Sequence, residues 1–400
     1  MPPAATVAAV CIAQIVGMAS FATFPALMPT FFGEWSLSNT EGGWLNGIYY
    51  AGYLTAVPIL VSLTDRVDAR PVYLTACLVT AASALGFAVL ADGFWSALVW
   101  RALGGAGLAG TYMVGLKALT DRIELGGQSR SVAFYTASFS IGASLSYFLA
   151  GWFEPSFGWR AAFALAAIGP AVAFGLVLAV LRPRRQETQP DTRLLDFRPV
   201  LRNRKAMGYV LAYTAHNWEL FGFRSWIVTF LVFSAALQPD GASGWLAATT
   251  LAALINMLGL PASVIGNEFA SRFGRRRVVI ALMLISAAVS CLLGFSATWP
   301  FALVVALFCV SGVAVSWDSS SITAGAVADA DPAYRGATMA VHSMFGFAGA
   351  FVGPLVFGVV LDLAGGGTSL TAWGFAFISM GLGVAAGPLA LWLLSGKRAA

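Results

Sequence analysis

Apolar runs long enough to cross a bilayer follow one another along the whole chain, and this feature limits the possible folds most strongly. A helix that spans the hydrocarbon core needs about 20 mostly apolar residues. Only 10% of the 400 residues are charged, whereas soluble domains carry about 25%, so a soluble surface would not cover these runs. We therefore predict an all-α membrane protein with twelve transmembrane helices. The predicted spans are residues 6–32, 43–63, 71–91, 95–117, 131–153, 161–181, 207–233, 244–265, 278–297, 301–326, 338–361 and 372–394.

Basic residues are concentrated in alternate loops, and this sets the predicted orientation. Cytoplasmic loops of membrane proteins carry an excess of Lys and Arg. With the N-terminus inside, the inner segments hold 20 of the 23 Lys and Arg, counting Lys117 at the edge of the fourth span, whereas the outer loops are mainly acidic. We therefore expect a multi-pass protein of the cell inner membrane with both termini in the cytoplasm.

The longest predicted connection, residues 182–206, lies at the middle of the chain and holds eight bases. We interpret it as a cytoplasmic linker between an N-terminal bundle, residues 1–181, and a C-terminal bundle, residues 207–400. A membrane-surface role for these bases is favoured over partner binding. The loops after the second and eighth spans repeat weakly, with Asp65-Arg66 and Ser271-Arg272 at corresponding positions. Duplicated halves are common in secondary transporters.

Several other classes of protein are disfavoured by the sequence. The net charge of +5 comes mostly from short loops, so nucleic-acid binding is not indicated. The four cysteines lie in apolar runs without metal-ligand spacing, and no Walker-type phosphate loop is present. We expect no enzymatic activity, no cofactor, no metal and no cleavable signal peptide. The expected partners are the lipid bilayer, a small-molecule substrate and protons, and the expected state is a monomer.

The loop after the second span resembles the most specific motif of the major facilitator superfamily, Gly-x-Leu-Ala-Asp-Arg-x-Gly-Arg-Arg. The matching residues are Leu63, Asp65, Arg66 and Arg70, and the departures are Val61, Asp68 and Ala69. The loop after the eighth span keeps Arg272, Gly274, Arg275 and Arg276 but has Ser271 in place of the aspartate. Residues 101–107 match the family pattern Arg-x-x-x-Gly-x-Gly, and residues 158–163 resemble the Gly-Trp-Arg-x-x-Phe that often opens the sixth helix.

This resemblance implies two pseudo-symmetric six-helix bundles around a cavity that helices 1, 4, 7 and 10 line. It is specific for the superfamily and not for a substrate. The drug-antiporter signature Gly-x-x-x-Gly-Pro is absent from the fifth span and appears in the eleventh instead, at residues 349–354. The drug-export branch is therefore disfavoured.

Ionisable residues inside spans are candidates for proton coupling, because charge within a membrane is costly and usually marks a pathway. Glu219 lies near the middle of the seventh span, three residues from His216, and Asp318 lies in the tenth span. A structural ion pair or capped carboxylate is the alternative for Glu219, and ordinary helix packing is the alternative for His216. Hydrogen bonding to helix carbonyls is the alternative for the hydroxyl residues beside Asp318.

Polar residues on the same helices are candidates for the substrate cavity. On the seventh span Tyr213, Asn217 and Arg224 share a stripe, because residues four and seven apart lie on one face of a helix. Glu219 and Arg224 are five apart, so we do not expect them to pair. The remaining cavity candidates are Arg101, Tyr112, Ser319 and Asn256, with Tyr49, Tyr50, Tyr53 and His342 as weaker ones.

The resemblance also implies a conformational latch at the inner ends of the second and eleventh helices. Asp65 and Arg66 would hold these ends together in the outward-facing state, with Asp65 near the start of the eleventh helix, where the helix dipole favours an acid. Arg70 and Arg272 complete the predicted gating set.

The sequence therefore favours a secondary active transporter that moves a small polar or anionic organic solute by alternating access, coupled to protons. Two alternatives stay open. One is an exporter of amphipathic compounds, and the other is a membrane sensor or assembly factor that has the same fold but transports nothing.

Overall fold

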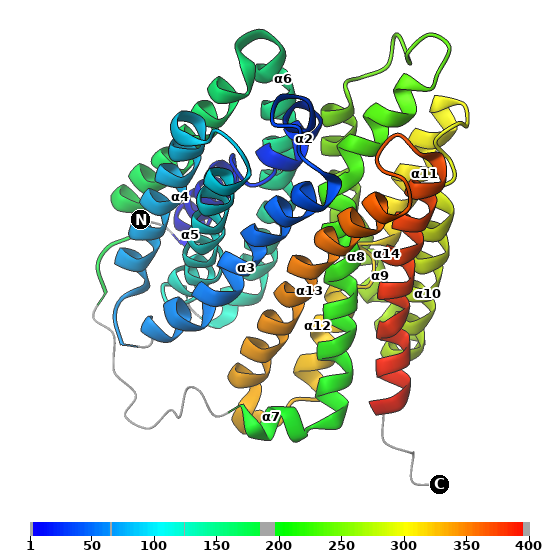
Figure 1. Ribbon diagram of the computed structural model, residues 1–400. Helices are drawn as coiled ribbons and strands as arrows, with labels where there is room; N and C mark the ends of the chain where they lie inside the picture. Colours follow the sequence, from blue (N-terminus) through cyan, green and yellow to red (C-terminus); the bar gives the residue numbers. More distant parts are fainter. Residues whose placement is uncertain (1–2, 65, 124, 185–196, 395–400) are drawn as a thin grey trace, which may run out of the picture. The chain divides into compact units, whose positions relative to one another are not determined.

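The computed structural model describes residues 3–64, 66–123, 125–184 and 197–394, which form helices joined by turns (Figure 1). The described residues contain no β-strand, so the all-helical prediction is confirmed. The chain divides into two compact units. Unit 1 comprises Met1–Ser36, Ile48–Thr192 and Ala247–Met257, and unit 2 comprises Leu37–Gly47, Arg193–Leu246 and Leu258–Ala400. The sequence-based division at residues 181 and 207 stays a prediction.

Unit 1 contains helices drawn from blue through cyan to green in Figure 1. They are α1 (Pro3–Gly17), α2 (Thr23–Glu34), α3 (Asn39–Leu63) from residue 48 onward, α4 (Ala69–Leu90), α5 (Phe94–Thr120), α6 (Leu125–Val180) and the start of α9 (Ala248–Phe273) up to residue 257. The helix α4 packs against α5 and α6, and α1 packs against α6. The aromatic side chains of Tyr73 and Tyr135 are fully buried in the core that these helices form.

Unit 2 contains the remaining helices, with α8 at its centre. They are α7 (Arg198–Arg202), α8 (Arg204–Ala236), α9 from residue 258 onward, α10 (Arg275–Leu293), α11 (Phe301–Ala314), α12 (Ser319–Ala328), a 3-10 turn (Pro332–Tyr334), α13 (Arg335–Leu363) and α14 (Leu370–Leu394), together with the start of α3 up to residue 47. The helix α8 packs against α12, α13 and α14, and α10 packs against α14. Because α8 is surrounded in this way, most of its side chains are buried.

Eight segments of the described chain are long and apolar enough to cross a membrane. They are Ala69–Leu90, Ser131–Val180, Arg204–Ala236, Ala248–Phe273, Arg275–Leu293, Phe301–Ala328, Arg335–Leu363 and Leu370–Leu394. Ser131–Val180 is 50 residues long and includes two of the spans predicted from sequence. The chain is thus a multi-pass membrane protein, while the number of twelve spans stays a prediction.

The first predicted span, residues 6–32, is interrupted. The helix α1 ends at Gly17, and α2 begins at Thr23. The hydroxyl of Ser146 donates to the carbonyl of Ala19 at 2.6 Å and accepts from the N–H of Ala22 at 2.9 Å. Irregular backbone is tolerated at membrane depth when the protein itself satisfies its polar groups, and this serine does so. A hydropathy pattern does not detect such a break, because the run stays apolar through it.

The tenth predicted span, residues 301–326, is interrupted as well. The helix α11 ends at Ala314, and α12 begins only at Ser319. The indole N–H of Trp317 donates to the carbonyl of Leu282 on α10 at 3.3 Å. The break leaves Asp318 at the N-cap position of α12, where its side chain caps no backbone N–H. That carboxyl is therefore available to another part of the fold.

Two predicted loops are short or partly helical in the structure. Within α6, two helices meet at a sharp kink at Gly158, inside the outer loop expected at residues 154–160. The φ of Gly158 is +78°, a left-handed conformation that glycine adopts without steric cost. The predicted linker, residues 182–206, contains α7 and the start of α8 at Arg204, while residues 185–196 lie outside the described part.

Glycines allow close helix contacts on α5 and α13. A Cβ at Gly105 on α5 would collide with the carbonyl oxygen of Tyr49 on α3, and a Cβ at Gly349 on α13 would collide with the carbonyl oxygen of Thr214 on α8. Small residues let helix backbones approach closely in membranes. The contact between α8 and α13 therefore depends on Gly349 having no side chain.

We expect Gly349→Ala to lower the free energy of unfolding by about 1–3 kcal/mol, the usual cost of overpacking. Gly336→Ala on the same helix is the matched control, because nothing lies within 4 Å of a Cβ there. Thermal unfolding of both purified variants in one detergent measures the difference. Equal melting temperatures for the two variants would contradict the close-packing account.

Candidate functional site

The middle of α8 carries three buried polar side chains. Its N-terminus is capped by Asn203, whose side chain accepts from the N–H of Ala206 at 3.2 Å. The side chains of His216, Asn217 and Glu219 are buried, with no more than 1% of each residue exposed. Polar groups at this depth require partners. Serines of α10 supply them to Glu219, and Asp318, at the start of α12, lies beside His216.

Glu219 is held by two serines of α10. The hydroxyl of Ser286 lies 2.9 Å from both carboxylate oxygens, and the hydroxyl of Ser290 donates to Oε1 at 2.6 Å. The two serines are four residues apart, so they lie on one face of α10. Within the described part of the chain, the hydrogen-bond donors to Glu219 are thus neutral hydroxyls.

His216 faces the acid that the helix break leaves uncapped. Its Nδ1 lies 2.8 Å from Oδ1 of Asp318, and both side chains are only 1% exposed. The two atoms have the separation of an ion pair without the alignment of a hydrogen bond. The structure therefore brings together two predicted proton-coupling residues, one on α8 and one between α11 and α12.

Three aromatic rings form a row beside this pair. The ring of Tyr213 stacks on His342 of α13, with centroids 3.9 Å apart, and on His216, with centroids 5.8 Å apart. The Nε2 of His342 lies 3.3 Å from the hydroxyl of Thr323 on α12. Asn217 follows Tyr213 by one helical turn on the same face of α8. The row joins α8, α12 and α13 into one polar cluster.

The other predicted cavity residues lie outside this cluster. Arg101 is buried in unit 1, with its guanidinium carbon 4.4 Å from the ring centroid of Tyr49 and 5.2 Å from that of Phe24. Tyr112 stacks on Tyr135. Asn256, Ser319 and Arg224 have separate contacts: the side chain of Asn256 donates to the carbonyl of Ala252, the carbonyl of Ser319 accepts from Thr323, and the guanidinium of Arg224 lies over the ring of Phe221.

The predicted gating residues that the structure describes lie at or near helix ends: Arg66 precedes α4, Arg70 is in its first turn, and Arg272 is in the last turn of α9. Asp65 lies outside the described residues, and Arg66 is exposed. The guanidinium of Arg70 donates to the carbonyl of Leu178 at 2.9 Å. Arg272 is exposed and pairs with Glu268 one helical turn away at 2.8 Å. Pairs of this exposed kind contribute little to stability.

The strongest loop contact involves Asp68, one of the departures from the family motif. Its carboxylate pairs with Arg122 at 2.8 Å and accepts from the N–H groups of Arg184 at 2.8 Å and Arg70 at 3.2 Å. Burial by itself raises the pKa of Asp68, but these hydrogen bonds outweigh burial and hold the pKa below its ordinary value. The ionised carboxylate of Asp68 thus connects the start of α4 to Arg122 after α5 and to Arg184 after α6.

Sequence reasoning missed Ser286, Ser290 and Thr323 and ranked His342 low. The spacing of the two serines on one helix face was a usable signal. Serine and threonine in spanning helices usually bond to their own backbone, however, so the spacing alone did not single them out. Groups of three or more His, Cys, Asp or Glu with metal-binding geometry are absent from the described residues.

Long apolar helices, helix breaks and a buried polar cluster define an integral membrane protein with a polar interior. Its family follows from comparison with known proteins. The chain belongs to the Major Facilitator Superfamily, whose model matches residues 10–267 and 240–400.

Curated relatives are distant. A Haemophilus influenzae protein named for metabolite transport is 22% identical over 60% of this chain and 61% of its own length. The niacin transporter NiaP of Acinetobacter baylyi is 26% identical over 36% of this chain and 33% of its own. The methylenomycin A resistance protein of Bacillus subtilis is 27% identical over 83% of this chain and 68% of its own. The chain thus spans less than two thirds of the first two of these relatives.

Solved structures share the fold. The nucleoside transporter NupG superposes with a TM-score of 0.76 at 14% identity, covering 98% of this chain and all of its own. A bacterial homolog of the lysosomal transporter Spinster, in an inward-facing and unoccupied conformation, superposes with a TM-score of 0.75 at 13% identity, covering 98% of this chain and 95% of its own. At these identities the likeness concerns the fold alone.

We expect the two serines to stabilise the fold only through Glu219. The double substitution Ser286→Ala/Ser290→Ala would cost about 1–3 kcal/mol with Glu219 present, because the buried carboxyl loses its donors. It would cost little in a Glu219→Met background. Unfolding free energies of the four proteins give the coupling energy. Additive effects would contradict the contact.

We expect Asp68→Asn to lower the melting temperature at neutral pH. The folded pKa of Asp68 lies below its ordinary value, so its contribution is complete above about pH 4 and declines as pH falls through the lower folded pKa. Melting curves of both proteins between pH 7 and about pH 3 should therefore converge. Asp240→Asn, at an exposed turn, is the control. A difference in melting temperature between wild type and Asp68→Asn that stays the same at every pH would contradict the lowered pKa of Asp68.

Proposed function

We propose that this protein is a secondary active transporter that works by alternating access and is coupled to protons. The observation that carries the proposal is the pair of fully buried acids, Glu219 and Asp318, set against a histidine and two serines in the middle of unit 2. Ionisable groups within a membrane are rare and mark substrate or proton pathways.

The two acids differ in their partners, and this supports separate roles. Asp318 has an ionisable neighbour in His216 at 2.8 Å, so a proton gained by the histidine yields a compensated pair. Glu219 has only hydroxyl donors among the described residues, so a negative charge there is compensated poorly in a medium of low dielectric. A bound proton removes that charge. Glu219 is therefore our primary proton carrier, with Asp318 and His216 as its relay.

The solute side of the proposal rests on the polar stripe of α8 and on buried arginines. Tyr213 stacks on His216 and His342, so a solute that contacts Tyr213 would also influence His216. Arg101 and Arg224 are buried against aromatic rings, and a guanidinium binds carboxylate or phosphate with two parallel hydrogen bonds. Tyr112, Ser319 and Asn256 are the further proposed solute contacts, and the proposed solute is a small polar or anionic organic compound.

The remaining sequence-based assignments enter as proposals. Asp65, Arg66, Arg70 and Arg272 are the proposed gating residues. We propose a monomer in the cell inner membrane with both termini in the cytoplasm.

Export of amphipathic compounds is the second candidate. It is favoured by the methylenomycin A resistance protein, which is named for resistance to a compound and aligns over 83% of this chain. It is disfavoured by the missing drug-antiporter signature in the fifth predicted span. The direction of solute movement under an imposed proton gradient separates the two.

We expect Glu219→Gln and Asp318→Asn each to abolish proton-driven solute accumulation while solute exchange without a gradient persists. Each amide fills the same volume but cannot cycle a proton. A solute panel screened by thermal shift supplies the substrate. Radiolabelled uptake and internal pH are then recorded in proteoliposomes for wild type and both variants.

Asp240→Asn is the control, because it removes an acid from an exposed turn. Unchanged proton-driven accumulation in Glu219→Gln and Asp318→Asn would refute the coupling assignment. Absence of solute movement by the wild type under every imposed gradient would refute transport and favour a sensor or assembly factor.

A further inference from the structure

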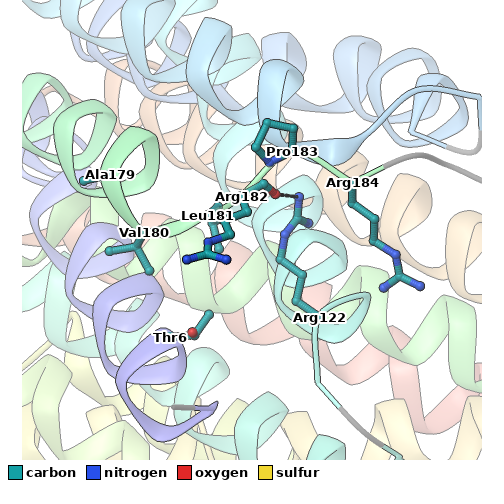
Figure 2. Close-up of a pocket in the computed structure, with 8 residues that line it drawn as sticks. All are labelled: Thr6, Arg122, Ala179, Val180, Leu181, Arg182, Pro183 and Arg184. Atoms are coloured by element: carbon teal, nitrogen blue, oxygen red, sulfur yellow. Dashed lines mark hydrogen bonds between the residues drawn. The ribbon is translucent and has the colours of Figure 1, made fainter. Parts of the chain in front are cut away.

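A pocket of about 320 Å³ lies in unit 1, where α6 ends. It is lined by the first turns of α1, by Arg122 after α5 and by residues 179–184 (Figure 2). Ala179, Val180 and Leu181 form an apolar wall, while Thr6 supplies a hydroxyl. The pocket thus combines apolar and cationic surfaces.

Arg122 is fixed in place before any ligand binds. Its guanidinium pairs with Asp68 at 2.8 and 3.0 Å and donates to the carbonyl of Arg182 at 3.0 Å. Figure 2 shows the guanidinium groups of Arg182 and Arg184 extending on either side of Arg122. The N–H of Arg184 donates to Asp68 at 2.8 Å, so the backbone that carries these side chains is held as well.

Positive charge is in excess at this pocket. Three arginines line it, and within the described chain Asp68 is the single acid bonded to this group, so positive charge outweighs negative by two there. Among the described residues, Arg182 and Arg184 have no ion-pair partner. A guanidinium favours phosphate because its planar N–H groups match the geometry of the oxygens. The pocket therefore suits a phosphate-bearing anion.

The position of the pocket favours a ligand at the membrane boundary. It follows directly on the last turn of the spanning segment Ser131–Val180. Apolar side chains of that segment are exposed close by, with Leu178 48%, Val172 46% and Ile168 56% exposed. Such a surface faces acyl chains when the helix spans a bilayer, and basic residues at this level attract anionic headgroups.

We propose that this pocket binds the phosphate group of an anionic ligand, with the headgroup of an anionic phospholipid as the favoured source and a soluble phosphate compound as the other. Arg182 and Arg184 supply the charge, and Arg122 supplies a preorganised donor. The site does not depend on the transport proposal, because none of its residues belongs to the proton or solute sets.

The test compares two double variants of the full chain with equal loss of charge. Arg182→Gln/Arg184→Gln removes the two pocket bases that have no ion-pair partner in the described part of the chain, and Arg202→Gln/Arg277→Gln removes two exposed bases of unit 2. Binding of phosphatidylglycerol is titrated in neutral detergent and read by native mass spectrometry, with phosphatidylcholine as the neutral-lipid arm and inorganic pyrophosphate as the soluble arm. Melting temperature without lipid confirms that each variant folds.

We expect the pocket variant to bind phosphatidylglycerol roughly thirtyfold more weakly than wild type, from the attraction that each base near the surface contributes. The control variant should differ from wild type by less than about threefold on the same scale. Selective loss of pyrophosphate binding instead would support the pocket and assign it a soluble ligand. Equal losses in both variants, or no binding of either phosphate compound by wild type, would overturn the proposal.

Discussion

The cost of charge at bilayer depth is the constraint on which the arrangement of unit 2 depends. An acid buried there without compensation costs several kcal/mol, and unit 2 buries two, Glu219 and Asp318. Each is met by a side chain from a different helix: serines of α10 for one and His216 of α8 for the other. The positions of α10 and α12 around α8 are therefore fixed by polar contacts as well as by packing.

The presence of long apolar helices could be predicted from the sequence, because bilayer thickness sets the length of a spanning helix. The charge of the loops then predicts which side of the membrane each loop occupies. The breaks after Gly17 and Ala314 were not predictable, because an apolar run says nothing about whether each backbone hydrogen bond continues. Ser146 illustrates the reason: the residue that satisfies the first break lies on α6, far along the chain from α1.

The sequence predicted most ionisable residues of the candidate site, but it predicted their contacts less well. Glu219, His216 and Asp318 stood out as ionisable residues in spans, and helical spacing placed the first two on one face. The contact between His216 and Asp318 occurs at the interrupted backbone before α12. A prediction that treats residues 301–326 as one regular helix does not include this break. Ser286 and Ser290 were missed because a serine in a helix has its own backbone as an alternative acceptor.

The bonds of Asp68 have a consequence for the order in which unit 1 assembles. Its carboxylate joins the loop that follows α3 to Arg122 and to the N–H of Arg184. Chains grow from the N-terminus at about 5–20 residues per second during synthesis, and Arg184 is made 116 residues after Asp68. The junction therefore closes only when the sixth predicted span has emerged, so the basic pocket beside it does not exist in shorter nascent chains.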